Sequence, residues 1–114
     1  MDFIKNNPSR KFKVGLKKIV ELSDVGKIKL LTDEIITFIT ESGKEYDLGR
    51  KSWGFYATPS INSRLKKEGF KTALVKNTQN RYYIMLVEKE KVDEFFSYIY
   101  EDQQEVIEWL DERK

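Results

Sequence analysis

The chain has 114 residues, of which 39% are hydrophobic and 35% are charged, and its formal net charge is +2. This length and composition suit one folded, well-solvated domain. The sequence contains no Cys and no His, which excludes disulfides, thiolate nucleophiles, Ser-His catalysis and metal sites built on these side chains. Carboxylate-bound Mg²⁺ or Ca²⁺ is the metal chemistry that remains, and we expect neither a metal site nor a cofactor.

Charge is distributed unevenly along the chain. Basic and acidic side chains number eight and three in residues 1–30, nine and six in residues 31–87, and four and ten in residues 88–114. A basic body can attract an anionic partner, but an acidic amphipathic helix packed on a basic sheet gives the same pattern. No apolar run is long enough for a secretory signal or for the ~20 residues of a membrane span. We therefore expect a cytoplasmic protein.

The N-terminal third is predicted to be extended after a short lead-in. Residues 1–10 are polar and aperiodic, so we predict a flexible lead-in there and a single domain over residues 11–114. Lys alternates with apolar residues over 11–22, with a break near 15–18, which is typical of a bulged or broken strand. The composition of residues 23–26, SDVG, favours a turn before a strand at 27–31.

Two β-hairpins are predicted in the middle of the chain. Residues 34–40, EIITFIT, are rich in β-branched side chains and favour a strand, and Gly43 allows the turn onto a second strand at 45–48. Farther on, the apolar stretches 71–77 and 81–88 flank a polar loop at 78–80. Both pairs are expected to be antiparallel.

Helices are predicted between and after these hairpins. Thr58 and Pro59 are residue types typical of an N-cap and a first helical position, and Gly69 suits a left-handed C-terminal cap, so we predict a short helix over 59–68. Residues 92, 95, 96 and 99 are apolar with helical spacing and predict a longer helix. Residues 104–111 fit either a strand or a helix, and their strand propensity favours the strand.

The order of these elements predicts an α+β fold. It would contain a mostly antiparallel sheet of about five to six strands, one short mid-chain helix and one longer C-terminal helix. Within it, Trp53 and Phe55 are expected to pack in the core, because aromatic side chains on strands usually do so.

The candidate ligand site is the corner where the extended segment meets the short helix. A helix beginning at Pro59 offers free amides and the positive end of its dipole, and nearby Arg side chains add charge, so a phosphate, carboxylate or sulfate is favoured. The candidate ligand-binding residues are Arg50, Lys51, Tyr56, Thr58, Ser60, Asn62, Ser63 and Arg64. Alternatively, both Arg side chains pair with nearby carboxylates and Asn62 supports the cap.

Two further functions compete with this binding site. RNA or single-stranded nucleic acid is suggested by Lys and Arg clusters and by Tyr82 and Tyr83 as stacking platforms. The basic residues concerned are Lys11, Lys13, Lys17, Lys18, Arg64, Lys66 and Lys67. Catalysis would need Asp47 as a base with Tyr56 or Lys51 as an acid, and no spacing demands it. We therefore expect a non-catalytic module that recognises an anionic small molecule or a partner protein.

The string EYDLGRKSWGFYATPSINSRLKKEGFKTALVKN resembles a family of small bacterial proteins that share a pattern close to EYDxxRKxWGFYATPSxNxRLxxxGxxxxLV. The similarity is strongest from Glu41 to Asn77. The resemblance implies a cytoplasmic accessory role near surface-polysaccharide or nucleotide-sugar synthesis, because relatives are often encoded beside genes for these pathways. The matching positions are Arg50, Lys51, Trp53, Tyr56, Thr58, Ser60, Asn62 and Arg64.

Overall fold

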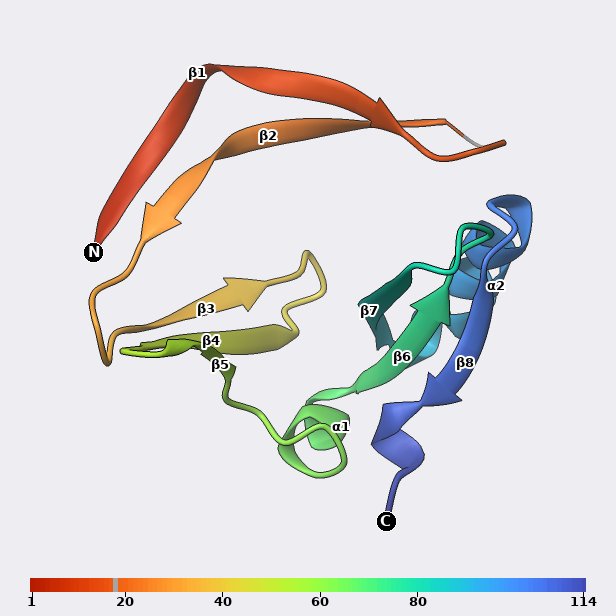
Figure 1. Ribbon diagram of the computed structural model, residues 1–114. Helices are drawn as coiled ribbons and strands as arrows, with labels where there is room; N and C mark the ends of the chain where they lie inside the picture. The colour runs from red at the N-terminus through yellow and green to blue at the C-terminus, as the bar shows by residue number, and fades with distance from the viewer. Residues whose placement is uncertain (18) are drawn as a thin grey trace. The chain divides into compact units, whose positions relative to one another are not determined.

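The computed structural model describes residues 1–17 and 19–114, which form eight strands, two α-helices and two 3-10 turns (Figure 1). The strands belong to three small sheets, in the orders β1-β2, β3-β4-β5 and β7-β6-β8. The predicted α+β class with antiparallel pairing is confirmed, but three sheets replace the single sheet that we expected. No described helix has both the length and the apolar character needed to cross a membrane.

The residues group into two compact units, where we expected one domain from residue 11 onward. Unit 1 contains Met1–Thr37 and Asp47–Thr58, and unit 2 contains Phe38–Tyr46 and Pro59–Lys114. The buried hydrophobic side chains of the described chain all belong to unit 2. Unit 1 therefore consists of sheets whose apolar side chains are exposed or half-buried.

A long two-stranded ribbon begins unit 1. Strand β1 (Asp2–Val14) pairs antiparallel with β2 (Val20–Lys29), with a register shift between Lys5 and Arg10. Residues 2–10, where we predicted a flexible lead-in, thus belong to a strand; Pro8 lies within the register shift, where the ladder is interrupted and an absent N–H is tolerated.

The turn predicted at residues 23–26 is wrong, because this segment lies inside β2. Gly26 explains the composition that suggested a turn. It has φ +156°, and a Cβ there would lie 2.4 Å from the carbonyl oxygen of Ile4 on the facing strand. Glycine is therefore needed for the close approach of two strands and not for a reversal of the chain.

The first predicted hairpin is confirmed. Strand β3 (Ile35–Ile39) is a neighbour of β4 (Glu45–Lys51), and β5 (Gly54–Ala57) pairs antiparallel with the other edge of β4. In the hairpin turn, the Thr40 N–H donates to the carbonyl of Lys44 over 2.9 Å, and Gly43 has φ +90°. The residues of this turn belong to unit 2.

Unit 2 is built on the sheet β7-β6-β8. Strand β6 (Phe70–Lys76) pairs antiparallel with β7 (Tyr82–Glu88) and with β8 (Glu105–Trp109). Helix α2 (Val92–Glu101) follows the turn η1 (Lys89–Lys91), and the turn η2 (Leu110–Glu112) follows β8. The predictions of the second hairpin, the longer helix and the C-terminal strand are confirmed.

The core of unit 2 lies between α2 and the sheet. Ile99 of α2 is buried with Ala73 and Val75 of the central strand. Five half-buried side chains pack around these three: Met85, Phe95, Tyr98, Val106 and Trp109. This packing fixes α2 against the sheet and positions the groove described below.

The short mid-chain helix ends as predicted but begins later. Helix α1 covers Arg64–Glu68 and not residues 59–68. Gly69 has φ +103°, and its N–H donates to the carbonyls of the preceding turn, as expected for a left-handed cap. At the other end, Ser60 begins a turn in which its carbonyl accepts from Ser63 and Leu65. That local bonding keeps residues 59–63 out of the helix.

Candidate functional site

The eight candidate ligand-binding residues are divided between the two units. Arg50, Lys51, Tyr56 and Thr58 belong to unit 1, and Ser60, Asn62, Ser63 and Arg64 belong to unit 2. Neither unit contains the complete set. Each unit therefore contains four of the candidate residues, and each group of four is described within its own unit.

In unit 1, strand pairing separates Arg50 from the other candidates. Arg50 pairs with Phe55, whereas Lys51 pairs with Gly54, and Gly49 pairs with Tyr56. Because side chains alternate between faces along a strand, Lys51 and Tyr56 share one face and Arg50 lies on the other. Lys51 is also ion-paired, with its Nζ 2.6 Å from an Asp33 carboxylate oxygen.

Arg50 retains one feature of a binding residue. Its Nη1 atom is buried and has no hydrogen-bond acceptor within the described chain. A shielded guanidinium N–H without an acceptor is costly and would be satisfied by a carboxylate or phosphate oxygen. This atom belongs to one face of the β4-β5 pair, so it supports anion recognition by Arg50 and not by the whole predicted set.

In unit 2, the side chains of two candidate residues make hydrogen bonds to the backbone, and a third makes no capping hydrogen bond. The Ser60 Oγ accepts from the N–H of Arg64 over 2.8 Å, and the Asn62 Nδ2 donates to the carbonyl of Arg113 over 3.3 Å. Ser63 is the N-cap of α1 and makes no capping hydrogen bond with its side chain. A helix of five residues beginning at Arg64 does not supply the amides and dipole that we placed at Pro59.

The prediction that Trp53 and Phe55 are core residues is wrong. Trp53 is 72% exposed and Phe55 is 60% exposed. Trp53 lies in the turn that joins β4 and β5, outside the pairing of the two strands. The aromatic residues indicated extended structure at β4 and β5. They did not indicate that the side chains of Trp53 and Phe55 are exposed.

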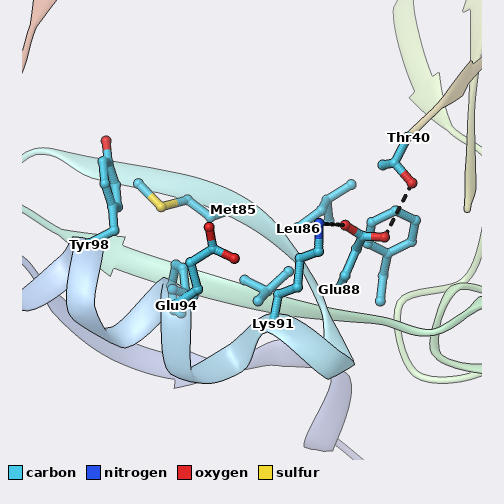
Figure 2. A pocket seen from close by; sticks show the side chains of 10 residues that line it. Thr40, Met85, Leu86, Glu88, Lys91, Glu94 and Tyr98 are labelled. Atoms are coloured by element: carbon cyan, nitrogen blue, oxygen red, sulfur yellow. Dashed lines mark hydrogen bonds and ion pairs between the residues drawn. The ribbon is translucent and has the colours of Figure 1, made fainter. Parts of the chain in front are cut away.

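A groove in unit 2 was not predicted from the sequence. It lies between β7 and α2, has a volume of about 450 Å³, and opens broadly to the surface (Figure 2). Its apolar lining comes from Phe70, Met85, Leu86, Val87 and Phe95, and its polar lining comes from Thr40, Glu88, Lys91, Glu94 and Tyr98. Residues 91, 94, 95 and 98 have helical spacing, which is the signal in the sequence that could have identified one wall.

Glu88 is fixed at one end of this groove. Its carboxylate accepts from the hydroxyl of Thr40 and lies 3.4 Å from the Nζ of Lys91 (Figure 2). It also accepts from the hydroxyl of Ser42. The Ser42 hydrogen bond, followed by the charge of Lys91 and the Thr40 hydrogen bond, holds the pKa of Glu88 below its ordinary value against the opposing effect of desolvation. Glu88 is therefore an ionised acceptor at neutral pH.

Glu94 differs from Glu88 because the described residues give its side chain no ion pair and no hydrogen bond. Figure 2 shows its carboxylate on the groove side of α2, between Lys91 and Tyr98. The groove thus combines an apolar floor with one fixed ion pair, one unpaired carboxylate and one phenol. Among the described residues, no cluster of acidic side chains is suited to hold a metal ion.

A second hollow lies at the register shift of the ribbon in unit 1. Its volume is about 550 Å³, and it is lined by Lys5, Asn6, Asn7, Pro8, Arg10, Asp24 and Lys27. Arg10 is paired with Asp24, with Nη2 and Oδ2 3.0 Å apart. Lys5 and Lys27 have no ion pair within the described chain. The sequence prediction overlooked this hollow because residues 1–10 were assigned to a lead-in.

The nucleic-acid surface predicted from the sequence is brought together only in part. Lys11 and Lys13 lie on β1, and Lys18 lies outside the described residues. Tyr82 and Tyr83 are adjacent on β7, so their side chains point to opposite faces. They do not form one stacking platform.

Comparison of the chain with known proteins finds no matching family model, no similar curated protein and no similar solved structure. The family suggested by the pattern in residues 41–77 therefore remains an expectation from that pattern. The geometry of the two hollows is the basis for a functional proposal.

Proposed function

We propose that this chain is a non-catalytic binding module and that its ligand occupies the groove between β7 and α2. The observation that carries the proposal is the groove itself, whose volume of about 450 Å³ falls in the range of small-ligand sites. Its apolar floor and few convergent polar groups are also typical of such sites. The walls are a paired strand and a packed helix, so the groove is formed before a ligand arrives.

The polar groups define the chemistry of the ligand. An apolar body would cover Met85 and Phe95, and a hydrogen-bond donor or a cationic group would reach the unpaired carboxylate of Glu94. A sugar meets this requirement, because one face of its ring is apolar and its hydroxyls donate. The carbohydrate role implied by the resemblance is compatible with this groove for a neutral or amino sugar. An anionic sugar would be repelled by Glu94.

Filling the groove is expected to abolish binding of an apolar probe. Met85→Trp places a large side chain on the groove floor, and we expect Nile red to bind about tenfold more weakly to this variant than to the wild type. The matched control is Ile84→Trp, because residue 84 lies on the opposite face of the same strand. Fluorescence titration measures both, and equal affinity of the two variants would contradict the assignment of the groove.

Polyanion binding by the ribbon is the second candidate function. The observation that favours it is a hollow whose lining includes Lys5 and Lys27, neither of which has a carboxylate partner within the described chain. A two-stranded ribbon that carries unpaired cations can track a phosphate backbone. Arg10 would contribute less, because Asp24 already neutralises it.

Removing both lysines is expected to reduce the salt dependence of RNA binding. For a labelled single-stranded oligouridine, the slope of log affinity against log salt should fall by about 1.4 in Lys5→Gln/Lys27→Gln, since two phosphate contacts are lost. Lys66→Gln/Lys67→Gln on α1 has the same net charge and serves as the control. If both double variants change the slope equally, the ribbon has no special role in RNA binding.

A further inference from the structure

The charged side chains that line the groove of unit 2 do not balance. They are Glu88, Lys91 and Glu94. Lys91 and Glu88 form an ion pair, with Nζ and Oε2 3.4 Å apart, so their charges offset each other. Glu94 has no ion pair and no hydrogen bond within the described chain. The lining of the groove therefore has a net negative charge, and Glu94 is its source.

The side chains near Glu94 suit an organic cation. Tyr98 lies one turn farther along α2 and lines the same groove, as do Phe95 and Met85 (Figure 2). Aromatic rings attract cations through their π faces, and the Met thioether is polarisable. A hydrated metal ion would leave this apolar surface unused, and the described residues contain no acidic cluster suited to a metal. The lining therefore favours a positive charge carried on an apolar body.

Glu94 also has a structural role that is independent of any ligand. Asp93 and Glu94 both belong to the first turn of α2, where a negative charge stabilises the positive end of the helix dipole. Asp93 is exposed and is not one of the residues that line the groove. The helix dipole therefore affects the two acidic residues alike, whereas a cation bound in the groove distinguishes them.

We propose that the ligand of this groove carries an ammonium group, which the carboxylate of Glu94 binds while Met85 and Phe95 contact the rest of the ligand. The inference rests on the proposed function, because it names a class of ligand for the same groove. Lys91 limits the affinity, since its own positive charge repels the ligand. The ammonium group can belong to an amino sugar or to an aliphatic amine, because Glu94 recognises the same chemistry in both.

Methionine supplies a direct reporter of the groove. The chain has two Met residues: Met85 lies in the groove, and Met1 precedes β1 and serves as an internal reference. Isotopic labelling of the Met methyl groups allows an NMR titration to follow each residue separately. The probes form two pairs that differ in charge. Choline is compared with the neutral alcohol in which carbon replaces its nitrogen, and glucosamine is compared with glucose.

We expect each ammonium probe to shift the Met85 signal with about fivefold higher affinity than its neutral partner. The pair that binds more tightly shows whether the body of the ligand is a sugar or an alkyl group. Glu94→Gln should abolish the preference for charge and leave the neutral probes unchanged. Lys91→Gln should increase the preference, because it removes the opposing positive charge. Asp93→Asn is the matched control and should bind all four probes as the wild type does.

Two kinds of failure are distinguishable. If Nile red binds but the charged probes bind no better than the neutral ones, or if Glu94→Gln and Asp93→Asn lose the preference equally, the ammonium assignment is wrong and the groove remains a binding site. If no probe shifts Met85 and Met85→Trp does not weaken Nile red binding, the proposed function itself is wrong, and this inference is overturned with it.

Discussion

Replacing Asp111 with Ala is expected to lower the free energy of unfolding of unit 2 by about 2–3 kcal/mol. Asp111 is 1% exposed and is one of few charged groups buried in the described chain. One carboxylate oxygen accepts from the backbone N–H of Thr72 over 2.9 Å, and the other lies 3.1 Å from the Nζ of Lys71. The variant leaves the buried N–H of Thr72 without its acceptor.

Lys71 extends the effect beyond one hydrogen bond. Its Nζ also lies 4.7 Å from the centre of the Trp109 ring, so Asp111 helps to hold the cation over this aromatic side chain. Chemical denaturation followed by Trp109 fluorescence, in a Trp53→Phe background, reports on unit 2 alone. We expect Asp111→Asn to lose less stability than Asp111→Ala, because its amide oxygen can still accept from Thr72.

The neighbouring Glu112 provides the control for charge. Its carboxylate is mostly exposed and lies 3.6 Å from Lys71, so Glu112→Ala removes the same charge beside the same lysine without leaving a buried donor. A change within about 0.5 kcal/mol is expected for this variant. Equal losses for Asp111→Ala and Glu112→Ala would mean that burial of Asp111 has no special importance.

The stability contribution of Asp111 is expected to depend on pH. Burial raises the pKa of this carboxyl, but the hydrogen bonds from Thr72 and Lys71 outweigh burial, and the folded-state pKa is lowered. A lowered folded-state pKa stabilises the fold above the unfolded-state value of about 3.9. This contribution is lost as the pH falls from about 3.9 through the folded-state pKa. The difference in stability between wild type and Asp111→Asn should therefore shrink in acid.

Local sequence signals predicted several elements of both units well. The two hairpins, the left-handed cap at Gly69 and the apolar stripe of α2 each depend on residues within one short segment. Glycine at positive φ, a turn of polar residues and helical spacing act over less than about ten residues, so they can be read without knowledge of the rest of the chain.

The signals failed where the decisive contact was distant in sequence. Gly26 looked like a turn residue, but its role is set by Ile4 on the facing strand. Residues 1–10 looked aperiodic because the register shift between Lys5 and Arg10 breaks the alternation of side chains. Residue types favoured a helix that begins at Pro59. Hydrogen bonds to Ser60 form a turn there instead, and the helix begins later.

The candidate site was the least predictable feature. Closeness in sequence placed eight polar residues together, but strand alternation separates Arg50 from Lys51 and Tyr56. The groove of unit 2 brings Thr40, Met85 and Glu94 together from three separate segments. Spacing along one helix indicates one wall of such a groove, and pairing and packing determine the other walls.

The core of unit 2 gives the second large effect. Ile99→Ala removes a side chain that is 4% exposed and packs against Ala73 and Val75. The loss combines the transfer free energy of the removed carbons with the cavity left behind, and we expect about 2–4 kcal/mol of destabilisation of unit 2. The helix would lose its only fully buried side chain among the described residues, so its packing against the sheet should weaken first.

Tyr100→Ala is the matched control for Ile99→Ala, because it is the next residue of α2 and is 84% exposed. It deletes a larger side chain, yet we expect a change within about 0.5 kcal/mol, since little of that side chain leaves water on folding. Both variants are compared by Trp109 fluorescence in the Trp53→Phe background. Because the groove depends on α2 and β7 staying in place, Ile99→Ala should also weaken Nile red binding. Unchanged stability of Ile99→Ala would contradict the packing of α2 on this sheet, and with it the formation of the groove before ligand binding.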